Sequence, residues 1–138
     1  MKLNRLSLII VFFSLLFSCG ETKEASLDNF NINGDVFSSG ESLIALAFGL
    51  HDLEVTTKDQ KTLLIGVHGS NSRGYEWVYP LKVLDKDTNL ISFFRWNDKG
   101  CPKPSVMSLL ENIRRKIDDN PHLERVILLG HSLSLIHI

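Results

Sequence analysis

The chain contains 138 residues, of which 43% are hydrophobic and 22% are charged, and its formal net charge is −1 at pH 7. This length and composition are typical of one globular domain, and they exclude a collagen-like or largely disordered chain. The near-neutral charge, without a cluster of basic residues, also argues against a nucleic acid as a partner.

The N-terminal residues predict a secretion signal with a lipid anchor. A basic start precedes an apolar run over residues 6–17, which is shorter than the roughly 20 residues of a membrane-spanning helix. The run ends in Leu16-Phe17-Ser18-Cys19, which resembles the lipobox of bacterial lipoproteins. The resemblance implies a signal peptide over residues 1–18, lipidation of Cys19, and membrane anchoring in the bacterial cell envelope, on the outer membrane or the periplasmic face. The alternative is a secreted protein in which Cys19 is incidental.

The segment after the signal is polar, and we expect residues 19–40 to form a tether that ends in a turn or a short strand. A folded domain is expected over residues 41–134. Near its start, residues 43–48 are almost wholly apolar, so periodicity cannot distinguish a buried strand from a short helix. The alanines and leucines of this run favour a helix. With Cys19 lipidated, Cys101 would have no partner for a disulfide.

Strands and helices are expected to alternate along the rest of the chain. Apolar runs predict buried strands at residues 62–67, 90–94 and 126–129. Apolar residues at helical spacing predict one helix around Trp77 and a second, amphipathic helix over residues 106–117. This alternation predicts an α/β fold, with a parallel sheet, flanking helices and right-handed crossovers.

Short motifs follow two of these strands. Gly130-His131-Ser132 comes directly after the last strand, and it is the front half of the Gly-x-Ser-x-Gly nucleophile elbow. Such an elbow is a strained strand-to-helix turn that exposes a serine hydroxyl. His68-Gly69-Ser70 follows the strand at residues 62–67. This order of strands and motifs resembles the first half of an α/β-hydrolase domain of the lipase and esterase type, and the resemblance covers about residues 60–134.

The resemblance implies a serine hydrolase that cleaves a small-molecule or lipid ester. Ser132 would be the nucleophile that forms an acyl-enzyme, and the backbone N–H groups of Ser70 and Leu133 would bind the oxyanion. Gly130 would permit the tight turn before the serine. Neither His68 nor His131 is expected to be the base, because in the family the base follows the last strand. No cofactor is expected, and no metal, because no cluster of ligands has the required spacing.

The C-terminal residues depart from the family pattern. Ser134 stands where the family usually has glycine, and residues 133–138 resemble translated adapter sequence, so we predict that this tail is not native. We find no complete catalytic triad, and we therefore expect a truncated α/β-hydrolase fold that is inactive by itself. The alternative function is that of a non-catalytic envelope lipoprotein that uses the same scaffold to bind a ligand or a partner.

Residues 95–98 follow the strand at 90–94 and have two interpretations. They would lie at the sheet edge where ligands collect in open α/β folds, so they could shape a substrate pocket. The interpretation that we favour is structural: Trp96 packs against the loop, and Asp98 pairs with Lys99 or Arg95.

Overall fold

The computed structural model describes residues 25–132. The predictions for the signal peptide, for lipidation of Cys19, for the oxyanion donor Leu133 and for the tail at 133–138 lie outside the described residues. Within residues 25–132, no helix is long and apolar enough to cross a membrane.

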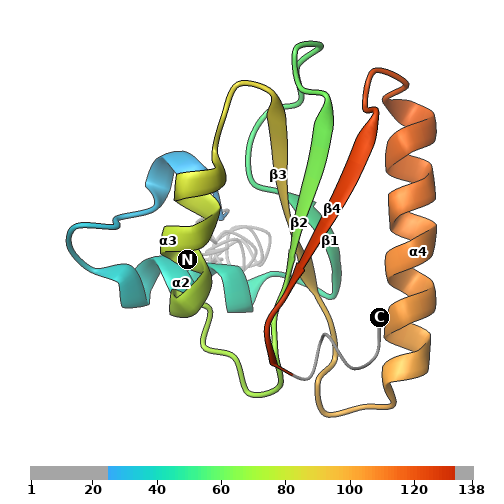
Figure 1. The fold of residues 1–138 in the computed structure, drawn as a ribbon. Coiled ribbons are helices and arrows are strands. Elements are labelled where there is room, and N and C mark those ends of the chain that lie inside the picture. The colour runs from blue at the N-terminus through green and yellow to red at the C-terminus, as the bar shows by residue number, and fades with distance from the viewer. Residues whose placement is uncertain (1–24, 133–138) are drawn as a thin grey trace, which may run out of the picture.

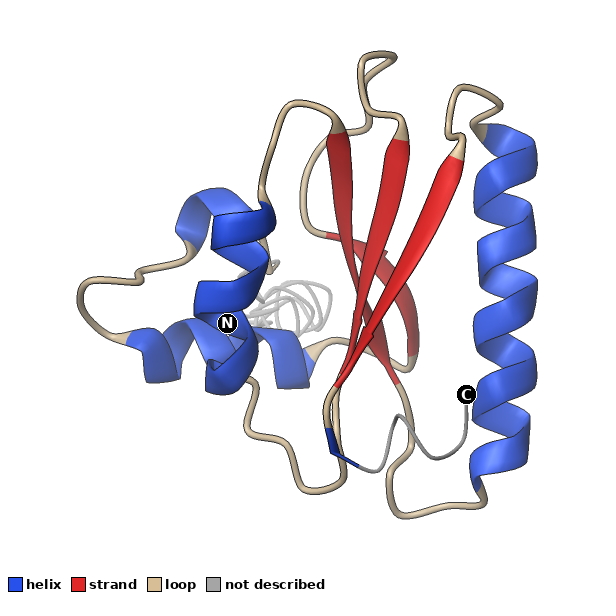
Figure 2. Ribbon diagram, in the orientation of Figure 1, coloured by secondary structure: helices blue, strands red, loops and turns tan. Residues whose placement is uncertain are grey.

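The described chain forms a four-stranded sheet with helices on both of its faces (Figures 1 and 2). Helices α2 and α3 lie on one face, and helix α4 covers the other. This arrangement confirms the expected α/β class. In chain order, the elements are η1 (Leu27–Asn29), α2 (Val36–Ala45), β1 (Gly49–Asp52), β2 (Thr62–Val67), α3 (Tyr75–Leu84), β3 (Asn89–Arg95), α4 (Pro102–Asp119) and β4 (Arg125–Gly130).

The sheet is mixed rather than parallel throughout. Its order is β1-β3-β2-β4, and β2 pairs in parallel with both β3 and β4. Strand β1, which the sequence did not predict, pairs antiparallel with β3. Strand β1 has only four residues and includes His51 and Asp52, so it lacks the apolar run by which the other strands are identified.

The core has one apolar layer on each face of the sheet. Strand β2 is buried along its whole length, because side chains of a strand alternate between the two faces and both faces are covered. Leu64 packs with α2 and α3, whereas Leu63 and Ile65 pack on the side of α4. Gly66 leaves room for the Trp77 indole, because a Cβ atom at residue 66 would lie 3.1 Å from that ring.

The expectation of a tether over residues 19–40 is wrong for its described part. Ala25, Leu27 and Phe30 are buried in the core, and the Leu27 N–H donates to the Leu53 carbonyl at 2.9 Å. Helix α2 also begins at Val36, earlier than the apolar run suggested. The sparse apolar residues of this polar segment are sufficient to attach it to the sheet, because each buried side chain contributes about 1.5–3 kcal/mol.

Candidate active site

The His68-Gly69-Ser70 motif and the Gly130-His131-Ser132 motif lie side by side, at the ends of the neighbouring strands β2 and β4. Val67 and Gly130 are register partners at the ends of β2 and β4, and the His131 N–H donates to the Val67 carbonyl at 3.3 Å. Because β2 and β4 are parallel, the chain after each strand emerges at the same edge of the sheet. Loops at this edge commonly form the ligand sites of α/β folds.

Ser132 has the backbone conformation of a sharp turn. Its φ angle is 58°, in the left-handed region that residues other than glycine rarely occupy, and its side chain is exposed. The chain therefore turns abruptly, two residues after β4 ends, and leaves the serine at the surface. Backbone strain of this kind concentrates at functional sites.

Gly69 lies directly against the turn that contains Ser132. A Cβ atom at residue 69 would be 2.7 Å from the His131 carbonyl oxygen and 3.0 Å from the Ser132 Cβ atom. Only glycine fits this approach without movement of the neighbouring backbone. The fold thus brings together the sequence motifs His68-Gly69-Ser70 and Gly130-His131-Ser132, which lie about 60 residues apart in the sequence.

His68 is buried, with 1% of its surface exposed, and both of its ring nitrogens have partners. Its Nδ1 atom lies 2.8 Å from the Gly69 carbonyl oxygen. Its Nε2 atom faces the Trp96 N–H at 3.1 Å and the Arg95 Nη1 atom at 2.9 Å. Burial is the main cause that lowers the pKa of His68, and the charge of Arg95 lowers it further, whereas the bond to the Gly69 carbonyl and the charge of Asp98 act in the opposite direction. A buried and fully engaged imidazole of this kind does not reach a substrate as a base.

Arg95 and Trp96 hold this histidine in place. The Trp96 indole stacks on the imidazole with a centroid separation of 5.6 Å, and its Nε1–H donates to the His68 carbonyl at 2.7 Å. Arg95 donates to the carbonyls of Ile44 and Trp96. The sequence indicated that Trp96 packs against a loop but did not identify His68 as its partner, because residues 68 and 96 are joined only by the pairing of β2 with β3.

The loop after β2 is also attached to the loop after β3. The Asn71 N–H donates to Asp98 Oδ2 at 2.5 Å, and Lys99 donates to the Asn71 side chain. Asn71 has a φ angle of 55°, which asparagine tolerates better than most residues. Asp98 forms no direct ion pair with Lys99 or Arg95 among the described residues, although burial lowers the pKa of Arg95 and the charge of Asp98 opposes that lowering. Its carboxylate instead caps the Asn71 N–H, which only the tertiary fold brings within reach.

The N–H of Ser70, one of the two expected oxyanion donors, has no acceptor among residues 25–132. The Gly69 carbonyl, which belongs to the same peptide unit, does have partners. It accepts from the His68 ring and from the Ser72 N–H at 3.3 Å. The loop thus presents one donor that is not used by the fold. Donors of this kind stabilise negative charge that develops on a substrate.

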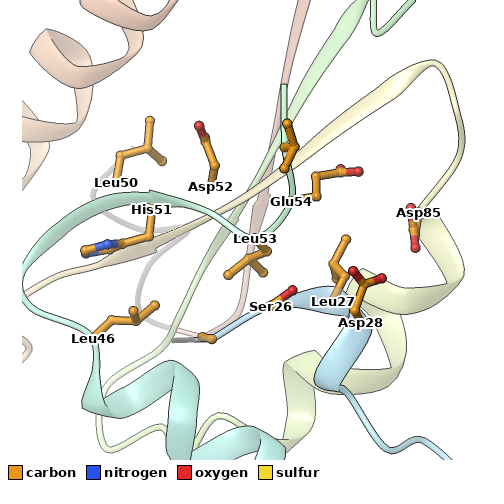
Figure 3. Close-up of a pocket in the computed structure, with 12 residues that line it drawn as sticks. Ser26, Leu27, Asp28, Leu46, Leu50, His51, Asp52, Leu53, Glu54 and Asp85 are labelled. Carbon is orange, nitrogen blue, oxygen red and sulfur yellow. The ribbon is translucent and has the colours of Figure 1, made fainter. Parts of the chain in front are cut away.

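A groove of about 690 Å³ lies elsewhere, between β1 and the N-terminal segment formed by residues 25–28 (Figure 3). Figure 3 shows the carboxyl groups of Asp28, Glu54 and Asp85 on one side of this groove. Burial raises the pKa of Glu54, and the charges of Asp85, Asp52 and Asp28 raise it further, against the lowering effect of the Ile91 N–H. The lining residues are Ala25, Ser26, Leu27, Asp28, Leu46, Leu50, His51, Asp52, Leu53, Glu54, Val55 and Asp85.

Neither this groove nor any other part of residues 25–132 contains three His, Cys, Asp or Glu side chains arranged to hold a metal ion. Comparisons with family models, with curated proteins and with solved structures find no match to this chain. The site is therefore described by its own geometry: an exposed serine in a strained turn, a glycine packed against that turn, and a backbone donor beside it.

Proposed function

We propose that Ser132 is the nucleophile of a serine hydrolase with an α/β-hydrolase fold, which cleaves carboxylic esters through an acyl-enzyme. The observation that carries the proposal is the positive φ angle of Ser132 immediately after a parallel strand, with Gly69 packed against the turn. The resemblance supplies the reaction class. The strained turn after β4 supports it, because β4 lies beside β2 and the His68-Gly69 loop follows β2 directly.

In this reaction, the Ser132 hydroxyl oxygen attacks the ester carbonyl carbon, and the hydroxyl proton passes to a base. The N–H groups of Ser70 and Leu133 stabilise the oxyanion, and a donor of this type contributes about 3 kcal/mol. The alcohol then leaves with a proton, and water releases the acid. His68 is engaged on both sides of its ring, so it is not available as the base. From the resemblance, we propose that the base and its acidic partner come from sequence outside residues 25–132.

We further propose that Cys19 is lipidated and that the enzyme is anchored in the bacterial cell envelope. The support for this part is the apolar run that ends in Leu16-Phe17-Ser18-Cys19. A membrane location suits an enzyme that acts on lipid esters, because a lipid anchor holds it at the surface where such substrates gather.

The decisive test is labelling by a fluorophosphonate, which reacts with an activated serine. In the full-length protein, Ser132→Ala should reduce labelling and ester hydrolysis by about a thousandfold or more, because the nucleophile is removed. Ser38→Ala, at an exposed position of α2, is the matched control and should change neither. Labelling that survives in Ser132→Ala contradicts the proposal.

A second candidate is a non-catalytic lipoprotein, and the acidic groove between β1 and the N-terminal segment favours it. Four carboxylates line this groove; Asp52 pairs with Lys116 and Asp85 with Lys82, so Asp28 and Glu54 would be the groups left for a cationic ligand such as a polyamine. If the full-length protein is not labelled by the fluorophosphonate but melts at a higher temperature with spermidine, this candidate is supported over the hydrolase.

A further inference from the structure

We propose that His68, held by Arg95 and Trp96, is a positioning residue that sets the direction of the Ser70 N–H toward the oxyanion. This inference rests on the proposed hydrolase function and assigns a role to a residue that the reaction itself does not use. It depends on the hydrogen bonds around His68 and on the planarity of the peptide bond between Gly69 and Ser70.

The partners of His68 determine its tautomer. Nε2 faces two donors, the Trp96 N–H and the Arg95 guanidinium, so this nitrogen must accept. The proton of the neutral ring therefore sits on Nδ1, which donates to the Gly69 carbonyl at 2.8 Å. The same ring thus accepts from Arg95, the last residue of β3, and from Trp96 after it, and donates to the loop after β2.

The bond to the Gly69 carbonyl also determines where the Ser70 N–H points. A trans peptide is planar, with its C=O and N–H directed to opposite sides, and the described chain has no cis peptide bond. Because His68 holds the carbonyl, the N–H of Ser70 points away from the His68 ring. It is this N–H that has no acceptor among residues 25–132.

The surroundings of His68 make it a rigid support. The ring lies between Phe93 and Trp96, with centroid separations of 5.9 and 5.6 Å. Arg95 is itself fixed by the Ile44 carbonyl at 3.0 Å and the Trp96 carbonyl at 2.7 Å. Since Gly69 packs on the turn of Ser132, a rotation of the peptide between residues 69 and 70 would move the donor relative to the nucleophile.

Two substitutions separate positioning from packing. In His68→Asn the amide nitrogen can replace Nδ1 as donor to the Gly69 carbonyl, whereas in His68→Gln the amide oxygen can replace Nε2 as acceptor but the donor is lost. In the full-length protein, we expect His68→Gln to lower kcat about a hundredfold, in the range for loss of an oxyanion donor, with little change in KM. His68→Asn should retain at least ten times more activity than His68→Gln, at a similar melting temperature.

The outcomes distinguish this inference from the proposed function. If Ser132 is labelled by the fluorophosphonate but the two His68 variants lose kcat equally, or neither loses it, the positioning role is overturned and the hydrolase stands. If Ser132 is not labelled, the hydrolase itself fails. A readout without catalysis is the ¹⁵N NMR spectrum of the same full-length protein, in which Nδ1 of His68 should be protonated and Nε2 should not. The reverse tautomer would overturn the inference.

Discussion

Glu54 is the carboxyl group within residues 25–132 whose pKa is raised by folding, so its ionisation opposes folding. Burial is the main reason that its pKa is raised above 4.5, and the neighbouring carboxylates of Asp85, Asp52 and Asp28 add to the effect. The unfolded chain therefore releases this proton at a lower pH than the folded chain. The stabilising contribution of the protonated group is fully present below pH 4.5 and is lost as the pH rises through the folded pKa.

We predict that Glu54→Gln raises the melting temperature at pH 7 but not at pH 4. The amide oxygen can still accept from the Ile91 N–H, which Glu54 Oε1 contacts at 2.6 Å, while the repelling charge is removed. The gain should be modest, because Glu54 is partly exposed and solvent screens its neighbours. Glu124→Gln is the control, since its pair with Lys61 is exposed and 3.5 Å long. An equal gain at both pH values would contradict the prediction.

Helices α2 and α3 meet at a contact that only glycines allow. A Cβ atom at Gly40 would lie 2.2 Å from the backbone nitrogen of Tyr75, and one at Gly74 would lie 2.1 Å from the Gly40 carbonyl oxygen. Gly74 also has a φ angle of 82°, which suits glycine at the N-cap of α3. This close crossing lets α2 and α3 share one apolar layer over the sheet.

We predict that Gly40→Ala destabilises the fold by about 1–3 kcal/mol, as overpacking of a closed contact does. By helix propensity alone, alanine in place of glycine would stabilise α2 by roughly 0.5–1 kcal/mol, so the sign of the change tests the contact. The measurement is the urea midpoint of the chain, with Ser38→Ala as the control at an exposed position of the same helix. A stabilised Gly40→Ala variant would show that the helices are not in close contact.

At the scale of the whole described domain, the side of β4 that faces away from β2 has no partner strand among residues 25–132 and is the surface most prone to association. Strand β4 is the last strand in the sheet order, and its side chains are only partly buried, whereas those of β2 are fully buried. The N–H groups of Arg125 and His131 point toward β2, so by alternation those of Val126 and Leu128 point outward. An apolar edge with free backbone groups pairs readily with another chain.

We therefore expect the 138-residue chain to self-associate through β4. Val126→Pro should reduce association, because proline removes an outward N–H and leaves the pairing with β2 intact. Ile127→Pro is the matched variant: it removes an inward N–H and should unfold the sheet instead. Light scattering measures association, and circular dichroism measures folding. If Val126→Pro associates as strongly as the unchanged chain, another surface is responsible.

The sequence by itself determined the strands β2, β3 and β4 and the amphipathic helix α4, because apolar periodicity is a local property. It also identified Ser132 and the His68-Gly69 motif as candidates, since each follows a buried strand directly. Only the tertiary structure decided that β1 is antiparallel, that residues 25–40 pack on the core, and that Arg95 and Trp96 support His68. These features depend on contacts between residues far apart in the chain, which arise when the sheet order brings them together and leave no periodic pattern in the sequence.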